Sequence, residues 1–498
     1  MHAGLSITVA DIDRVRDIAA RLNAAWIGGR LVSGKGLARQ NDLSPYDGRV
    51  LAAVEMSDAA QVDAAVQSAR QALKGPWREM GHQGRASLLR KLADAVESQG
   101  QEFALLESLD VGKPIQHALN DDVPTTVGVL RWYASLVETA YDMAPTRRHG
   151  VLVQIAREPQ GVVGIVLPWN YPLTTLALKL GPALAAGNTV VCKPADDTPL
   201  TTIRLAQLAT EIGFPAGVIN VVPGTGKEAG RALGLHPDVA AINFTGSTAT
   251  GRQFLHYSAE SNLKEISLEC GGKNPAIILP DADLARVGDE IATGFLMNSG
   301  QLCSSISRIL APRAREAEVR ELLANKMAEW PIGDPFDPRT RIGPLVSDIH
   351  AAKVDRAIDS EKRHNNDLII SSAALTGNSV RLVSPVVFFN VAETSPAWTD
   401  EIFGPVLSVR FYDEVADAVA SANATIYGLS AYVFGKDGKS ISDAAAELDA
   451  GFVAVNAFCE GDFTTPFGGF KTSGFGGKDK GIQSLDQYSR TKSVWWAV

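Results

Sequence analysis

The fold is decided by residues 161–224, which read GVVGIVLPWNYPLTTLALKLGPALAAGNTVVCKPADDTPLTTIRLAQLATEIGFPAGVINVVPG. Short apolar runs, bounded by Gly and Pro, alternate with longer segments whose apolar residues recur every three to four positions. A strand–helix–strand rhythm of this kind joins neighbouring strands through crossover helices. The stretch therefore predicts a parallel, doubly wound sheet of the Rossmann-like kind.

The same kind of pattern extends in both directions. Residues 58–73 and 84–114 carry apolar residues at helical spacing, which predicts a mainly helical region upstream. Downstream of Gly271, a second β–α series runs from NPAIILP (274–280) to GFVAVN (451–456). We predict an α/β protein with a doubly wound domain followed by a second α/β domain.

Length and composition narrow the class of protein. A chain of 498 residues is too long for one typical core, and its net charge of −9 argues against nucleic acid or an anionic membrane as a partner. There is no secretory signal and no run of ~18 apolar residues. The four cysteines form no CxxC pair, and the histidines form no HExxH, so we expect no disulfide framework, no metal and a cytoplasmic location.

The C-terminal segment LDQYSRTKSVWWAV (485–498) alternates like a strand and ends in apolar residues. An apolar terminal strand with nothing beside it exposes an edge that promotes association. We therefore expect a partner subunit.

Two glycine- or hydroxyl-rich junctions follow strands, where open α/β proteins bind ligands. The segment VVPGTGKEAG (221–230) spaces its glycines as GxGxxxG rather than GxGxxG, so it marks either a phosphate loop or ordinary turns. In FTGSTATG (244–251), Ser247 either bonds a pyrophosphate or caps the following helix. At a third junction, Lys193 and Asp196 are either ribose ligands or solvated charges.

Three residues together indicate acyl transfer. Cys303 follows a predicted helix, Glu269 follows a strand-like run and precedes two glycines, and Asn170 lies between two prolines in PWNYP. A lone cysteine is more often a buried apolar residue than a nucleophile. A thiol, a carboxylate on a flexible turn and an immobilised amide are nevertheless the groups that acyl transfer through an oxyanion requires.

Six motifs then identify a resemblance. PWNYP, FTGST, LECGGKN, GQLC, EIFGP and PFGGFKTSG occur in the order and approximate spacing of the aldehyde dehydrogenase superfamily. The resemblance covers nearly the whole chain from about residue 40. It implies a coenzyme domain (1–139 and 160–271), a catalytic domain (272–470), and a small β oligomerisation element (140–159 and 471–498) that forms a homodimer or homotetramer.

The resemblance also implies roles for single residues. Cys303 matches the nucleophile, the Asn170 amide and the Cys303 N–H match the oxyanion hole, and Glu269 matches the base that activates water. Lys179 matches a residue of the proton path. Glu269 favours hydrolysis over acyl transfer to CoA, and the complete site argues against a non-enzymatic relative. The sequence contains no GxSxG elbow, the motif typical of a serine hydrolase of the α/β-hydrolase kind.

The implied coenzyme is NAD, with NADP possible. Asp196 stands where most relatives have Glu, which weakens the ribose assignment, and its charge favours NAD by repelling a 2′-phosphate. The residues that match coenzyme contacts are Leu167, Pro168, Trp169, Asn170, Lys193, Asp196, Gly226, Gly230, Phe244, Gly246, Ser247, Glu401 and Phe403.

The aldehyde tunnel is expected to contain two carboxylates among aromatic rings, which suit a cationic tail unless both acids simply face solvent. The segments EGDFTTPFGGFK, SLDVGKPI and VLRWYASLVETAYDMAPT resemble the branch that acts on aminoaldehydes such as γ-glutamylaminobutyraldehyde and guanidinobutyraldehyde. An aromatic aldehyde is the alternative substrate. The expected tunnel residues are Tyr171, Leu302, Phe458, Glu460, Asp462 and Phe467, and Leu302 and Ser305 depart from the usual residues beside the nucleophile.

Overall fold

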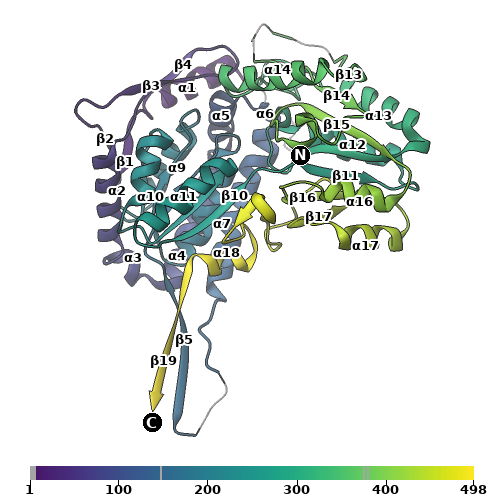
Figure 1. The fold of residues 1–498 in the computed structure, drawn as a ribbon. Helices are drawn as coiled ribbons and strands as arrows, with labels where there is room; N and C mark the ends of the chain where they lie inside the picture. The colour runs from purple at the N-terminus through teal and green to yellow at the C-terminus, as the bar shows by residue number, and fades with distance from the viewer. Residues whose placement is uncertain (1–6, 146–148, 374–375, 378, 380, 498) are drawn as a thin grey trace.

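The computed structural model describes residues 7–145, 149–373, 376–377, 379 and 381–497. Two open sheets, each covered by helices, lie side by side, and a two-stranded ribbon projects from them (Figure 1). A separate antiparallel pair joins β3 (Arg39–Leu43) to β4 (Val50–Glu55) near α1 (Val9–Ala19). The prediction of two α/β units is confirmed.

The first sheet has the strand order β18-β10-β9-β6-β7-β8-β1-β2. The five strands from β10 to β8 run parallel, and the edge strands are antiparallel. Its strands are β1 (Ala25–Ile27), β2 (Arg30–Val32), β6 (Val162–Val166), β7 (Thr189–Lys193), β8 (Ile219–Val221), β9 (Ala241–Gly246), β10 (Glu265–Cys270) and β18 (Gly474–Phe475).

Both faces of this sheet are buried, because successive side chains of a strand point to opposite faces. Val163 and Ile165 pack into one core, whereas Val162 and Val166 pack into another. The first core is formed with α4 (Gly81–Ser98), α5 (Gly100–Val111), α7 (Val123–Glu138), α8 (Pro172–Ala185) and α9 (Leu200–Glu211). The second is formed with α2 (Ala59–Ala72), α10 (Arg231–Leu235) and α11 (Thr248–Glu260).

The second sheet has the order β13-β14-β15-β12-β11-β16-β17, parallel from β14 to β17. Its strands are β11 (Asn274–Ile278), β12 (Ile306–Pro312), β13 (Leu368–Ile370), β14 (Val386–Phe389), β15 (Val406–Tyr412), β16 (Ser430–Phe434) and β17 (Phe452–Val455). One face is covered by α12 (Leu284–Leu296) and α13 (Glu316–Ala328), and the other by α14 (Asp348–Lys362), α16 (Val415–Asn423) and α17 (Gly438–Glu447).

The ribbon consists of β5 (Val151–Pro159) and β19 (Ser489–Ala497), paired antiparallel along their full length. It extends away from both sheets, and Trp495 is 59% exposed (Figure 1). Within residues 471–498, expected to belong to the oligomerisation element, β18 joins the edge of the first sheet and α18 (Gly481–Gln487) contacts α8. Among the described residues, no helix is both long and apolar enough to span a membrane.

Candidate active site

The segment that carries Cys303 begins with an unusual turn. α12 ends at Leu296, and the 3-10 turn η3 (Met297–Gly300) contains Asn298 and Ser299 with φ of 49° and 59°. Gly300 follows with φ of 74°, and a β-carbon there would lie 2.5 Å from the carbonyl carbon of Gly404. Left-handed conformations at residues other than glycine cost energy and cluster at functional sites. Glycine is therefore required at 300 to bring the chain round to Cys303.

Side chains of the second sheet hold the cysteine in place. Asn274 Nδ2 donates to the carbonyl oxygens of Cys303 and Ser305, both at 2.8 Å, and the Tyr432 hydroxyl donates to the Ser304 carbonyl oxygen at 2.7 Å. The Ser305 hydroxyl donates to the Gly294 carbonyl oxygen at 2.9 Å. The departure noted at Ser305 thus serves to anchor the loop to α12.

Cys303 is half-buried as a residue, and the surroundings of its thiol favour the protonated form. Burial is the main cause that raises its pKa well above the usual value, and the carboxylates of Glu460, Glu401 and Glu269 raise it further. The thiolate is the nucleophilic form of cysteine. A base or a nearby positive charge is therefore needed to activate it.

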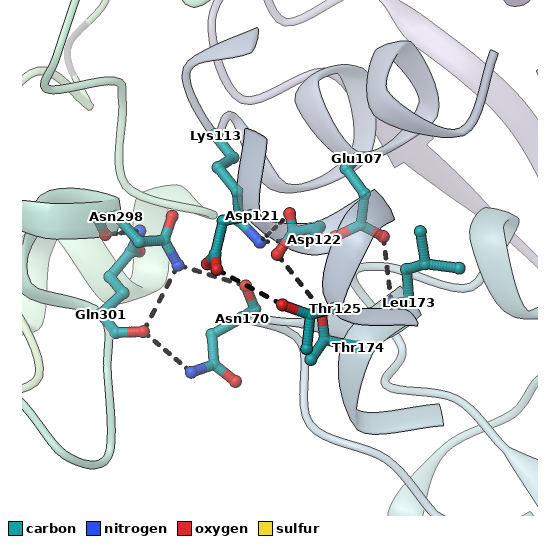
Figure 2. A network of polar contacts seen from close by, with 10 residues as sticks. All are labelled: Glu107, Lys113, Asp121, Asp122, Thr125, Asn170, Leu173, Thr174, Asn298 and Gln301. Atoms are coloured by element: carbon teal, nitrogen blue, oxygen red, sulfur yellow. Dashed lines mark hydrogen bonds and ion pairs between the residues drawn. The ribbon is translucent and has the colours of Figure 1, made fainter. Parts of the chain in front are cut away.

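Asn170 is bonded to this same turn. Its side chain is buried, its Nδ2 donates to the Gln301 carbonyl oxygen at 2.8 Å, and its own carbonyl oxygen accepts from Asn298 Nδ2 at 3.1 Å (Figure 2). The bond to Gln301 uses one of the two amide hydrogens. Asn170 follows β6 of the first sheet, so this pair of bonds ties the first sheet to the nucleophile turn of the second.

Glu269 lies where the sequence analysis did not place it. It is the penultimate residue of β10 and is buried, rather than standing on a flexible turn. Neither carboxylate oxygen has a hydrogen-bond partner within the described part of the chain. Burial, and then the charge of Asp479, raises the pKa of Glu269 well above its usual value, and Lys179 and Lys478 oppose this rise. A carboxyl group in such surroundings is suited to act as a base near neutral pH.

Lys179 is fully buried in α8, and its Nζ lies 3.2 Å from Asp479 Oδ2. Asp479 is buried as well, so the pair lies inside the protein beside Glu269. The sequence analysis named Lys179 but not its partner.

The parallel strands β6, β7 and β9 end at one edge of the first sheet, the place where open α/β proteins bind ligands. Lys193 ends β7, and its Nζ forms an ion pair of 2.6 Å with Asp196 Oδ1. The Leu167 N–H donates to the Lys193 carbonyl oxygen at 3.0 Å, and Pro168 and Trp169 follow, both half-buried. A cation, a carboxylate and hydroxyl groups along this edge fit the ribose and phosphate groups of a dinucleotide.

The glycines of this edge differ in what their surroundings require. Nothing lies within 4 Å of a β-carbon built on Gly226, and Gly230 has one neighbour at 3.9 Å. By contrast, a β-carbon on Gly246 would lie 2.7 Å from the ring of Phe244, which is buried beneath it. Packing thus demands glycine at 246, whereas the space over Gly226 is open, which suits a ligand lying against that backbone, and Gly230 is buried.

Ser247 is exposed and caps α11, because its hydroxyl accepts from the Thr250 N–H at 3.3 Å. The capping alternative is therefore observed. The N-terminal end of α11 also has backbone N–H groups without partners inside the helix, and such groups favour bound anions.

A second group of residues faces the crevice from the second sheet. Glu401 Oε1 accepts from the Gly272 N–H at 3.0 Å, and burial raises the pKa of Glu401 to about 7. A β-carbon on Gly271 would collide with this carboxylate. Phe403 has φ of 63° and packs edge-on against Trp169 at 5.2 Å.

His350 joins these rings, although the sequence analysis did not identify it. Its ring lies 5.0 Å from that of Trp169, and its Nε2 donates to the Phe403 carbonyl oxygen at 2.8 Å. Burial lowers the pKa of His350 to about 4, so the ring is neutral at physiological pH. Its sequence context, DIHAAKVDR, is that of an ordinary helix and gave no signal.

The expected tunnel residues occupy varied surroundings. Glu460 is not a free carboxylate, because it accepts from the Ser304 hydroxyl at 2.7 Å and lies 3.3 Å from Lys480 Nζ. Asp462 is exposed and accepts from the Thr464 N–H of its own turn at 2.9 Å. Both acids thus have partners within the chain, and their expected attraction for a cationic substrate stays a prediction.

The apolar members of the expected tunnel are mostly packed against neighbours. Leu302 is 7% exposed beside Cys303, and Phe458 is half-buried with its ring 5.4 Å from that of Tyr432. Phe467 is buried against Phe452, with ring centroids 6.0 Å apart.

Tyr171 lies next to a charged group that the sequence analysis missed. Lys113 Nζ lies 3.5 Å from the centre of the Tyr171 ring and 2.6 Å from Asp122 Oδ2. Glu107, also buried, accepts from the Leu173 N–H at 3.1 Å, which braces the first turn of α8 (Figure 2).

Asp121 precedes Asp122 in a π-turn, η1 (Ala118–Asp122), between α6 (Ile115–His117) and α7. Its carboxylate has no ion-pair partner among the residues that the structure describes, and its hydrogen bond to Thr125 Oγ1 is long at 3.5 Å. Burial and the Asp122 charge raise the pKa of Asp121 to about 6, and Glu460 contributes. Burial raises the pKa of the Tyr171 hydroxyl well above its usual value, and the charges of Asp121 and Cys303 contribute to this rise.

These elements define a class of protein before any comparison is made. A doubly wound sheet with a dinucleotide-type crevice meets a second α/β unit, and a cysteine, a buried carboxyl group and a fixed amide converge where they meet. Such a combination is typical of an oxidoreductase that works through a covalent bond to cysteine.

The chain belongs to the aldehyde dehydrogenase family, whose sequence model matches residues 31–494. It is 47% identical to an aminoacetaldehyde dehydrogenase of Pseudomonas aeruginosa over 458 residues, which is 91% of each chain. It resembles the crystal structure of gamma-glutamyl-gamma-aminobutyraldehyde dehydrogenase from Burkholderia cenocepacia, with TM-score 0.92, 39% identity and coverage of 98% and 99%. It also resembles the NAD+ complex of aldehyde dehydrogenase from Bacillus cereus, with TM-score 0.93, 38% identity and coverage of 97% and 98%.

Proposed function

We propose that this aldehyde dehydrogenase uses Cys303 as the nucleophile, Asn170 as an oxyanion donor, Glu269 as the hydrolytic base and NAD as the coenzyme. The observation that carries this proposal is the bonding of Asn170 to the turn before Cys303, beside a buried carboxyl group that has no hydrogen-bond partner among the described residues. The NAD+ complex of the Bacillus cereus relative supports the choice of coenzyme.

The chain would hold NAD through residues of both units. Lys193 and Asp196 suit the adenosine ribose, the end of α11 suits the pyrophosphate, and Glu401 suits the other ribose. Bound NAD supplies the oxidant that accepts hydride from the aldehyde carbon. The rings of Trp169, Phe403 and His350 pack against one another and would give that side an aromatic surface.

In the first half of the reaction, the Cys303 thiolate adds to the aldehyde carbonyl carbon and forms a thiohemiacetal. The remaining N–H of Asn170 and the backbone N–H of Cys303 stabilise the negative oxygen. Loss of hydride converts this adduct to a thioester. Because the turn is fixed by Asn274 and Ser299, these donors need little reorganisation as the charge develops.

In the second half, water adds to the thioester carbonyl carbon and passes a proton to Glu269. The C–S bond then breaks, releasing the acid and the Cys303 thiolate. A carboxyl group whose pKa is raised by burial is a stronger base than one in water. The buried position of Glu269 therefore favours hydrolysis over transfer to an external thiol.

The roles of Cys303 and Glu269 are separated by rapid kinetics. Cys303→Ala is expected to lower turnover by more than a hundredfold with NAD binding nearly unchanged, because only the covalent route is deleted. Glu269→Gln is expected to keep a burst of NADH and then stall at the thioester. Cys303→Ala turnover above about a hundredth of wild type would refute the nucleophile, and equal loss of burst and steady state would restrict Glu269 to thiol activation.

We further propose that the substrate is an ω-amino or acylamino aldehyde. The names of the two relatives above support this class. In this chain, the group suited to an ammonium ion is Asp121, whose carboxylate has no cation partner among the described residues and lies near Tyr171. A carboxylate and an aromatic ring together bind ammonium ions by charge attraction and cation–π contact.

The substrate proposal is tested with aminoacetaldehyde, 4-aminobutanal, pentanal and a vanillin-like aldehyde. Wild type is expected to favour the amino aldehydes in kcat/KM, and Asp121→Asn is expected to lower kcat/KM for them about tenfold while changing pentanal less than twofold. Asp462→Asn is the matched control, because its carboxylate serves its own turn. A preference for the aromatic aldehyde, or equal losses on amino and neutral substrates, would contradict the role of Asp121.

A homodimer or homotetramer is also proposed, with β5 and β19 as the contact. The exposed Trp495 and Trp496 on this ribbon support association with a second copy. The unpaired cysteines are consistent with a reducing cytoplasm, which we propose as the location. The division into coenzyme, catalytic and ribbon units remains part of the same proposal.

A further inference from the structure

Glu269 is flanked by two lysines whose situations differ. Lys179 is fully buried and paired with Asp479, which is itself buried. Lys478 is only half-buried, and its Nζ donates to a short glycine segment, Gly468–Gly469, that also lies against Glu269. One lysine beside Glu269 is therefore enclosed in the protein interior, and the other is partly exposed to solvent.

Glu269 and Lys478 both lie against Gly468, on the side where a side chain would be. A β-carbon on Gly468 would lie 2.7 Å from Lys478 Cδ and would overlap Glu269 Oε1. Lys478 Nζ donates to the carbonyl oxygen of Gly468 and, at 3.5 Å, to that of Gly469. Only a residue without a side chain allows the carboxylate and the lysine chain to approach this closely.

Lys478 is one of the residues that line an open groove on the surface. The groove has a volume of about 450 Å³ and is lined by Gly469, Phe470, Phe475, Lys478, Gln483 and Gln487. Lys478 Nζ also lies 5.1 Å from the centre of the Phe470 ring. Of the two lysines beside Glu269, Lys478 is thus the one that reaches a solvent-facing surface.

The charges around Glu269 can be assigned from every side. Asp479 disfavours its ionised form, and Lys179 and Lys478 favour it. Cys303 and Cys270 also lie within reach of its charge. Lys478 itself faces one charged group, Glu269. Lys179 is held in an ion pair with Asp479, whereas Lys478 forms no ion pair among the described residues, so the charge of Lys478 is the less compensated of the two.

We propose that Lys478 is a positioning residue for hydrolysis, whose positive charge acts on Glu269 across the space that Gly468 leaves open. This inference rests on the proposed role of Glu269 as the base. When water attacks the thioester, one O–H bond breaks and its proton passes to Glu269. The base must then lose that proton before the next cycle. The Lys478 charge favours this loss, and the groove beside it offers water that can take the proton.

The test measures the pH dependence of steady-state turnover against that of the NADH burst. Lys478→Met is expected to shift the rise of steady-state activity to higher pH by about one unit, with about tenfold loss on the acid side of the rise and full recovery above it. The burst amplitude should stay unchanged. Lys478→Arg should restore the wild-type profile, because it retains the charge.

Lys471→Met is the matched control, since Lys471 lies on the same segment but pairs with Asp449. An unchanged pH profile in folded Lys478→Met, or an equal shift in Lys471→Met, would overturn the inference. Glu269→Gln is measured alongside. If it fails to stall hydrolysis, the base assignment itself is wrong, whereas stalling in Glu269→Gln with a normal Lys478→Met rejects only the role of Lys478.

Discussion

Lys113 is the residue whose replacement tests the surroundings of the site most directly. It is fully buried, and its Nζ contacts Asp122 at 2.6 Å, Glu107 at 3.5 Å and the Tyr171 ring at 3.5 Å. Both carboxylates in turn bond to the first turn of α8, at Leu173 and Thr174 (Figure 2). Lys113→Met keeps the length of the side chain and removes the one charge that the two acids share.

The size of the effect follows from this burial. Removing one partner of a buried ion pair costs about 3–5 kcal/mol, because a charge is left without compensation. Burial already raises the pKa of Asp122 to about 7, and Lys113 opposes that rise. A carboxyl group with a raised pKa becomes neutral by taking up a proton as the pH falls. The loss of stability should therefore be large at pH 8 and small at pH 6.

Thermal unfolding at a fixed scan rate measures this difference, since a chain with two sheets does not unfold in a single two-state step. We expect a midpoint about 10 °C lower at pH 8 and less than half that shift at pH 6. The double variant Lys113→Met/Asp122→Asn should recover at least half of the loss. Equal shifts at both pH values, or no recovery in the double variant, would refute the reasoning.

Three further outcomes are expected. NAD should exceed NADP in kcat/KM by about tenfold because of the Asp196 charge, which its ion pair with Lys193 reduces but does not remove, and equal efficiencies would contradict this. Burial lowers the pKa of His117 from 6.5 to about 4, so the unfolded chain binds a proton that the folded chain does not, and stability should fall between pH 6.5 and 4. His117→Gln should flatten that decline in a thermal-unfolding series. Gly300→Ala should lower kcat more than tenfold, since its β-carbon would meet Gly404, and a wild-type kcat would show that the turn tolerates it.

The sequence predicted the two sheets because their strands are buried on both faces. β6, for example, is buried at every position and therefore reads as a continuous apolar run. The edge strand β18 was missed, because Gly474 and Phe475 carry no strand pattern and pair with β10 only through long-range contacts. Secondary structure set by distant partners leaves little trace in local sequence.

The site was predicted unevenly for a similar reason. Cys303 and Asn170 stand in recognisable motifs, but the pairing of Glu460 with Lys480 joins residues that sequence spacing does not relate. Asp121 was missed because the segment ALNDD reads as an ordinary helix, whereas the structure forms a π-turn that changes which way its side chains face. Lys478 lies in GGKDKG, which resembles a solvated turn.

The charges around Cys303 connect substrate choice with the rate of the chemical step. Three carboxylates, Glu460, Glu401 and Glu269, help to keep the pKa of the thiol high. An ammonium group bound at Asp121 would add a positive charge to surroundings in which carboxylates disfavour the thiolate, and a positive charge near a thiol favours its ionised form. An amino aldehyde would then help to form the nucleophile that attacks it. The advantage of amino over neutral aldehydes should consequently appear in the rate of the NADH burst, and not only in KM.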